Sequence, residues 1–210
     1  MKELKLESTY KGTRILIGNE KRSMINDMIK ILIDKGFTEV QIPILQLQET
    51  FSGKVGDENS KMMFSFKDRG DRNVCLAPEY TAVIQQMAAK PFKQEKELKL
   101  FYVQECFRGE APQAGRYRQF TQLGVEIINP NKETLIENVG ELAEELMKVM
   151  NVKYEINYDV VRGLDYYKDG KGFEISCEAL GSSKQVCGGG TYAGGIGFAI
   201  GIDRLMLLNS

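Results

Sequence analysis

The sequence predicts an α+β fold, formed by one domain that spans residues 1–210. Residues 20–35 and 134–150 carry apolar side chains at helical spacing. Residues 154–160 alternate strictly between apolar and polar side chains, as a half-buried strand does. With 210 residues, of which 42% are hydrophobic, the chain can bury one sizeable core but has no room for a second full domain.

Composition excludes several classes of protein. Lys and Arg number 28 against 29 Asp and Glu, so the net charge of -1 gives no global attraction for nucleic acid, although a local basic patch stays compatible with it. No apolar run approaches the roughly 18 residues of a membrane span, and the start of the chain lacks a signal peptide's apolar core. We therefore expect a cytoplasmic protein with no membrane partner.

Cysteine and histidine content restricts the chemistry further. The four cysteines are scattered, without paired CxxC spacing, so we expect reduced thiols and no metal-binding side chains. The chain has no histidine, and so lacks the commonest general base. Catalysis would have to use carboxylates, arginines or groups of the substrate.

The first half of the chain predicts a helix, an edge strand and a hairpin. The helix of residues 20–35 should end at Gly36, because glycine suits a helix C-terminus. A strand over residues 37–45 contains Pro43, which cannot donate to a ladder, so the strand should lie at a sheet edge. Residues 51–71 predict a loop and then a hairpin that turns near Gly70.

The next segment predicts a short strand, a turn and a helix. The strand covers residues 74–77, the turn lies at Pro78, and the helix begins near Thr81. Glu79 stands at the end of this strand. Its carboxylate suits the binding of an ammonium group, and it equally suits the capping of the helix.

Residues 101–128 predict two strands joined by a loop, and they are the most informative stretch of the chain. The first strand ends at Arg108, the loop covers residues 109–115, and the polar residues of the second strand are Arg116, Arg118, Gln122 and Glu126. An arginine at each rim suits a triphosphate, because the planar guanidinium binds phosphate oxygens in pairs. The alternative is a surface hairpin with solvated arginines.

Several motifs resemble those of class II aminoacyl-tRNA synthetases, in the form found in histidyl-tRNA synthetases. The second class II motif is similar to FRxExPQxGRYRQFxQLGxE, which runs from Phe107 to Glu126. Residues 161–167, VRGLDYY, resemble the histidine-specific signature, and residues 196–208 resemble the third motif, a strand leading to a helix that opens at Gly201. Residues 11–14, KGTR, are similar to the family's opening segment, and residues 20–45 resemble the first motif.

The resemblance covers nearly the whole chain and implies its architecture. We expect a class II synthetase-like core: a mostly antiparallel sheet of about six strands flanked by helices, with ATP and the amino acid on its open face. It also implies a homodimer formed through residues 20–45.

The resemblance further implies the role of each site residue. For ATP, Arg108 would hold the α-phosphate, and Arg116 and Arg204 the outer phosphates, with Phe120 and Gly201 also in the nucleotide site. Arg162 would act with Arg108 in catalysis, between the substrate carboxylate and the α-phosphate. For the amino acid, the implied residues are Glu79, Thr81, Gln122, Glu126, Tyr167 and Tyr192, of which Glu126 and Tyr167 would read the imidazole of histidine.

The implied reaction is ATP-dependent activation of an amino acid, with histidine favoured, by a histidine–tRNA ligase-like enzyme. The substrate carboxylate is already a nucleophile, so the reaction needs alignment and charge neutralisation, without a general base. We expect Mg²⁺ to bridge the outer phosphates of ATP.

Departures from the family leave alternatives open. Tyr80, Thr191 and Ala193 replace residues usual in the amino-acid site, and Ala111 replaces an arginine. The family's inserted and anticodon-binding domains have no counterpart, so the acceptor could be tRNA, a small RNA element, a carrier protein, a small molecule or none. The chain could also be a histidine-sensing regulatory paralogue, like that of ATP phosphoribosyltransferase, or a shortened form of a longer synthetase. Retention of the four arginines favours the enzyme.

Overall fold

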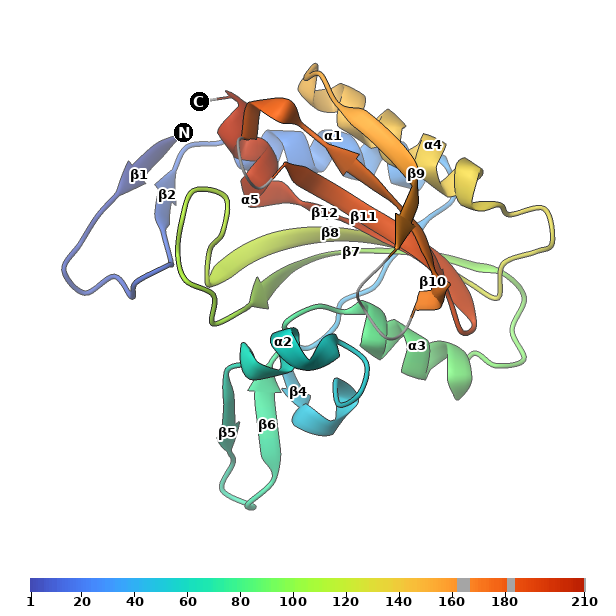
Figure 1. The fold of residues 1–210 in the computed structure, drawn as a ribbon, viewed down its shortest axis with the longest axis horizontal. Coiled ribbons are helices and arrows are strands. Elements are labelled where there is room, and N and C mark those ends of the chain that lie inside the picture. The colour runs from blue at the N-terminus through green and yellow to red at the C-terminus, as the bar shows by residue number, and fades with distance from the viewer. Residues whose placement is uncertain (162–166, 181–183, 210) are drawn as a thin grey trace.

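A seven-stranded mixed sheet lies at the centre of the structure, a computed structural model that describes residues 1–161, 167–180 and 184–209 (Figure 1). Its strand order is β3-β7-β8-β12-β11-β10-β9, and every pairing is antiparallel except that of β3 with β7. The strands are β3 (Thr38–Glu39), β7 (Leu98–Phe107), β8 (Gln119–Ile128), β9 (Glu155–Val161), β10 (Tyr167–Ser176), β11 (Gln185–Tyr192) and β12 (Gly195–Gly201). The predicted α+β class and the mostly antiparallel sheet are confirmed.

Two helices, α1 (Glu20–Asp34) and α4 (Ile136–Met147), cover one face of this sheet (Figure 1). Their apolar stripes pack on alternate residues of β8, namely Leu123, Val125 and Ile127, because successive side chains of a strand point to opposite faces. The predicted helix ends are close to those observed. Gly36 has φ +82°, which suits glycine after α1, and the end of the second predicted helix is a 3₁₀ turn, η2 (Lys148–Met150).

A second apolar cluster lies on the opposite face, under α3 (Thr81–Ala89). It joins the main sheet to a three-stranded sheet of order β4-β6-β5. These strands are β4 (Leu45–Leu47), β5 (Ser65–Lys67) and β6 (Asn73–Leu76). The predicted hairpin with its turn at Gly70 and the predicted strand before Pro78 are therefore present.

The prediction of one strand over residues 37–45 is wrong. Only Thr38–Glu39 pairs with β7, at the edge of the main sheet, and the Val40 N–H donates to the Phe101 carbonyl at 2.8 Å. The chain then passes Pro43, which has no N–H to donate. Beyond it, the Ile44 carbonyl accepts from the Ala77 N–H at 2.9 Å, so the chain has moved to the small sheet.

Other segments differ in detail from the sequence prediction. Residues 51–71 are not only loop and hairpin, because they include helix α2 (Gly56–Lys61), preceded by the 3₁₀ turn η1 (Gln48–Thr50). The N-terminus forms a hairpin of β1 (Lys2–Leu4) and β2 (Ile15–Ile17) that no sequence pattern indicated. After β10 comes η3 (Glu178–Leu180), and after β12 come α5 (Ile202–Leu205) and η4 (Met206–Asn209). Within the described ranges, no helix has the length and apolar character needed to cross a bilayer.

Candidate active site

A cavity of about 190 Å³ opens on the sheet face opposite α1 and α4, where β8, β12 and β11 meet the start of α3. Most of the predicted site residues line it: Glu79, Thr81, Arg108, Arg116, Phe120, Gln122, Gly201 and Arg204. These residues are brought together from β6, β7, β8 and β12 and the segments that follow or precede them. Further lining residues, which the sequence analysis did not single out, include Glu110, Tyr117, Gln185 and Asp203.

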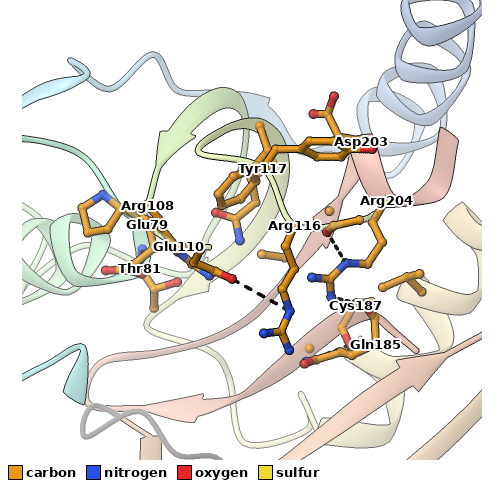
Figure 2. Close-up of a pocket in the computed structure, with 18 of the residues that line it drawn as sticks. Glu79, Thr81, Arg108, Glu110, Arg116, Tyr117, Gln185, Cys187, Asp203 and Arg204 are labelled. Atoms are coloured by element: carbon orange, nitrogen blue, oxygen red, sulfur yellow. Dashed lines mark hydrogen bonds and ion pairs between the residues drawn. The ribbon is translucent and has the colours of Figure 1, made fainter. Parts of the chain in front are cut away.

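Three arginines bring positive charge to this cavity. Figure 2 shows Arg116 and Arg204 on one side and Arg108 with Glu79 on the other. Arg108 follows β7; its Nε donates to the Pro78 carbonyl at 2.9 Å, and its guanidinium carbon lies 5.2 Å from the Phe120 ring centroid. Three guanidinium groups facing one small cavity suit the binding of a polyanion.

Arg116 and Arg204 differ in how firmly they are held. Arg116 precedes β8 instead of lying within the strand as predicted, and its ion pair with Glu110 is long at 3.9 Å. Arg204 lies on α5 and donates to two carbonyls, of Gly115 at 3.0 Å and of Gln185 at 2.6 Å (Figure 2). Burial lowers the pKa of Arg204, and the neighbouring charge of Arg116 lowers it further. An anion between these two side chains would relieve that repulsion.

Glu79 caps helix α3. Its Oε2 accepts from the Thr81 N–H at 2.8 Å and its Oε1 from the Ala82 N–H at 3.0 Å, and the side chain is buried while lining the cavity. The capping interpretation of Glu79 is therefore observed. A carboxylate has about four acceptor sites, so capping and the binding of a ligand ammonium are compatible.

Glu126 lies behind the cavity wall as part of a buried triad with Thr81 and Tyr192. The Thr81 hydroxyl donates to its Oε1 at 2.9 Å and the Tyr192 hydroxyl to its Oε2 at 2.6 Å. Burial raises the pKa of Glu126 to about 8, although these two hydrogen bonds act in the opposite direction. Gly197 faces Glu126 across the β8–β12 ladder, and a Cβ there would lie 2.0 Å from its Oε2, so the triad requires glycine at this position.

Tyr80, which departs from the family pattern, points away from the cavity. Its side chain is fully buried in the cluster under α3, its hydroxyl donates to the Glu105 carbonyl at 2.7 Å, and its ring lies 5.2 Å from that of Tyr102. Tyr80 therefore serves the core and does not narrow the site.

Asp203 is a buried acid that the sequence analysis missed. Its carboxylate accepts from Arg14, from Lys21 Nζ at 3.1 Å to each oxygen, and from the Thr121 N–H. An acid beside Arg204 in the sequence was the only signal for it. Arg14 could not have been paired with it in advance, because the two are 189 residues apart.

Of the two remaining predicted residues, Tyr167 and Arg162, only the backbone of Tyr167 is described. Tyr167 is the first residue of β10, and its backbone pairs in register with Tyr192. Arg162 lies outside the described residues. All four cysteines are buried and none forms a disulfide, and the described ranges hold no group of three His, Cys, Asp or Glu residues arranged for a metal ion.

Comparisons with known proteins agree with the motif resemblance. A family model described as histidyl-tRNA synthetase matches residues 19–152. The histidine–tRNA ligase of Methanococcus maripaludis (strain C7) is 40% identical over 151 residues, which cover 70% of this chain and 36% of the relative. That of Clostridioides difficile (strain 630) is 28% identical over 313 residues, covering 96% of this chain and 74% of the relative.

A solved structure is similar as well. Apo histidyl-tRNA synthetase of S. aureus superposes with a TM-score of 0.72 at 25% identity, covering 96% of this chain and 70% of that chain. The match to the Methanococcus enzymes spans little more than a third of their length.

Proposed function

Because the chain belongs to the histidyl-tRNA synthetase family, we propose that it activates histidine with ATP. The histidine carboxylate attacks the α-phosphorus, the bond to the β-phosphate oxygen breaks, and histidyl-adenylate and pyrophosphate result. The observation that carries this proposal is the convergence of Arg108, Arg116 and Arg204 on one cavity. A cavity lined by guanidinium groups supplies the alignment and charge neutralisation that phosphoryl chemistry needs.

In this proposal the arginines divide the triphosphate between them. Arg108, at the end of β7, holds the α-phosphate, and Arg116 and Arg204 hold the outer phosphates from the opposite side. Phe120 and Gly201 take the adenine, which suits a ring wall and a residue without a side chain. Mg²⁺ would enter with the nucleotide and would supply further charge neutralisation.

The amino acid would occupy the part of the cavity near α3. Glu79 and Thr81 seat its ammonium group, with Gln122 at its carboxylate, and Glu126 reads the imidazole together with Tyr167 and Tyr192. The polar group of Glu126, Thr81 and Tyr192 offers no favourable contact to an apolar side chain, so an apolar amino acid is rejected. Arg162 is assigned by the motif alone to the space between the carboxylate and the α-phosphate.

The acceptor and the assembly are parts of the same proposal. The relatives named above are histidine–tRNA ligases, which favours tRNA as the acceptor and gives the regulatory alternative no support. A homodimer through residues 20–45 is favoured by large apolar side chains exposed in that segment, since Ile33, Ile44 and Leu45 are 57%, 36% and 53% exposed.

ATP–pyrophosphate exchange across the twenty amino acids tests the activation step. We expect exchange that depends on ATP, Mg²⁺ and histidine. If no amino acid supports exchange while histidine still binds in calorimetry, the chain is a sensor and the enzymatic proposal is wrong.

A matched pair of variants tests the role of the cavity arginines. Arg116→Met removes one guanidinium that is 45% exposed and weakly paired, so the fold should survive. Arg69→Met removes an exposed guanidinium from the β5–β6 turn, far from the cavity. We expect Arg116→Met to lower exchange by roughly 10²–10³, the range for one lost charge-stabilising donor, and Arg69→Met to leave it unchanged. Equal rates for the two variants would remove Arg116 from the mechanism.

A further inference from the structure

Asp203, which lines the cavity, connects the turn that carries Arg204 to the N-terminal segment. Asp203 is 4% exposed and lies at the start of α5, immediately before Arg204. Its carboxylate receives hydrogen bonds from Arg14, Lys21 and the Thr121 N–H. This single carboxylate therefore connects the N-terminal segment, α1 and β8 to the turn that presents Arg204.

Arg14 also contacts the loop that carries Arg116. Its guanidinium carbon lies 3.5 Å from the centroid of the Tyr117 ring, which is a close cation–π contact. Tyr117 follows Arg116 directly and lines the cavity, where Figure 2 shows it near Asp203. One guanidinium group thus touches both of the elements that bring cations to the same side of the cavity.

The rest of the N-terminal segment runs along this loop. The Arg118 N–H donates to the Gly12 carbonyl at 2.7 Å, and the Arg118 guanidinium donates to the Tyr10 hydroxyl at 3.0 Å. Gly12 has φ +89°, and a Cβ there would lie 2.8 Å from the Arg118 side chain and 2.9 Å from Pro112. Residues 10–14 therefore pack closely against residues 110–118. This packing fixes the backbone of Arg14 relative to the loop that carries Arg116.

Such a connection counteracts the repulsion between two cations of the cavity. Arg116 and Arg204 repel each other, and they stand on separate backbone elements, a loop and a short helix. One direct hydrogen bond, from Arg204 Nε to the Gly115 carbonyl at 3.0 Å, joins the loop to α5. Without a second connection, this single bond would have to hold the two guanidinium groups together against their repulsion. Binding of a polyphosphate would then have to bring them back together, at a cost in affinity.

We propose that Arg14 is a positioning residue for the nucleotide: by binding Asp203 and stacking on Tyr117, it holds Arg116 and Arg204 at the spacing that polyphosphate requires. This inference rests on the proposed function, because it names what fixes the geometry of the ATP site. Arg14 acts through its neighbours and does not line the cavity itself.

Lys21 provides a matched control within the same ion-pair cluster. Lys21→Met removes a cation from Asp203 but leaves the stacking of Arg14 on Tyr117. Arg14→Met removes both the ion pair with Asp203 and the stacking on Tyr117. In each variant the Asp203 carboxylate keeps one cationic partner, so neither leaves a buried charge unpaired. Arg14→Lys keeps a positive charge for Asp203 and loses the planar stack, so it retains the fold even if the methionine variant does not.

Steady-state ATP–pyrophosphate exchange of the full chain gives the decisive comparison. We expect Arg14→Met to lower kcat/KM for ATP by 10- to 100-fold, which is the size of effect that misplacing a substrate-binding side chain by about 1 Å can have. KM for histidine should change less than about twofold. Arg14→Lys should be intermediate, and Lys21→Met should stay within about threefold of the parent.

The possible outcomes separate the two proposals. A parent chain without exchange refutes the proposed function. An active parent for which Arg14→Met matches Lys21→Met, or raises KM for histidine as much as for ATP, refutes only the positioning role and makes the cluster a structural ion pair. If Arg14→Met fails to fold, Arg14→Lys gives the test. The inference is overturned if the kcat/KM for ATP of Arg14→Lys equals that of the parent.

Discussion

Glutamine in place of Glu126 should abolish one source of pH-dependent stability. Burial raises the pKa of this carboxyl group from an ordinary value of 4.5 to about 8 in the folded chain. Between these values the folded chain binds more protons than the unfolded chain, so the contribution of Glu126 to stability is fully present below about pH 4.5 and is lost as the pH rises through 8. At about 1.4 kcal/mol per pH unit, this interval corresponds to at most about 5 kcal/mol.

Glu126→Gln keeps the size of the side chain and an oxygen that accepts from the Thr81 or Tyr192 hydroxyl. We expect the variant to gain about 1–3 kcal/mol relative to the parent between pH 5.5 and pH 8.5, below the upper limit because a charged carboxylate would draw in water. Urea unfolding at pH 5.5, 7.0 and 8.5 measures this difference. Glu133→Gln, at an exposed position, serves as the control.

Parallel stability curves of parent and Glu126→Gln across this pH range would refute the reasoning, because they would mean that Glu126 ionises as it does in water. The same variant probes specificity. Calorimetry should show histidine binding weakened far more than ATP binding. If histidine fails to bind the parent in the presence of ATP while another amino acid binds, the specificity proposal is wrong and the activation chemistry stands.

Three further predictions follow from the packing around the site. Gly197→Ala places a methyl group against the Glu126 carboxylate and the Val125 carbonyl, so chemical denaturation should show a loss of about 1–3 kcal/mol and calorimetry weaker histidine binding; unchanged values would contradict the contact geometry. Tyr80→Phe removes the hydrogen bond to the Glu105 carbonyl and should cost about 1 kcal/mol of stability, with KM for histidine unaltered because the ring points away from the cavity. Leu45→Glu should shift the mass in light scattering toward the monomer, whereas Leu135→Glu, 55% exposed on α4's N-terminal side, should not; a monomeric parent at micromolar concentration would rule out the dimer.

The elements that were predicted correctly are those in which local pattern and tertiary environment agree. The apolar stripe of α1 packs on the sheet as its spacing predicted. The alternating residues 154–160 lie in and just before the edge strand β9, where alternate residues are half-buried. Pro43 shows where local reasoning ran out. It correctly indicated an edge, but whether the chain continues in one sheet or moves to another depends on Ala77, which lies far along the sequence.

The site residues divide in the same way. Arg108, Arg116 and Arg204 could be named because they stand in motifs that resemble those of the family, and they lie after β7, before β8 and on α5. The triad of Glu126 was harder to foresee, since the pKa of Glu126 depends on its burial. The triad also needs the space left by Gly197, which faces Glu126 from a strand about 70 residues later. Arg14 and Asp203 lay beyond prediction because neither has a partner near it in the sequence.

The order of strands in the main sheet has a consequence for chain entropy. β8 and β12 are hydrogen-bonded neighbours, and the described cavity residues come from residues 55–122 and 185–204, so α4 and β9 between them supply none. Closing a loop costs only about 0.6 kcal/mol more for each doubling of its length. Extra residues at the turn between α4 and β9, where Asn151 and Lys153 are exposed, would therefore lengthen the connection from β8 to β12 at little energetic cost. The cavity geometry can thus stay the same while the number of residues inserted at that turn varies.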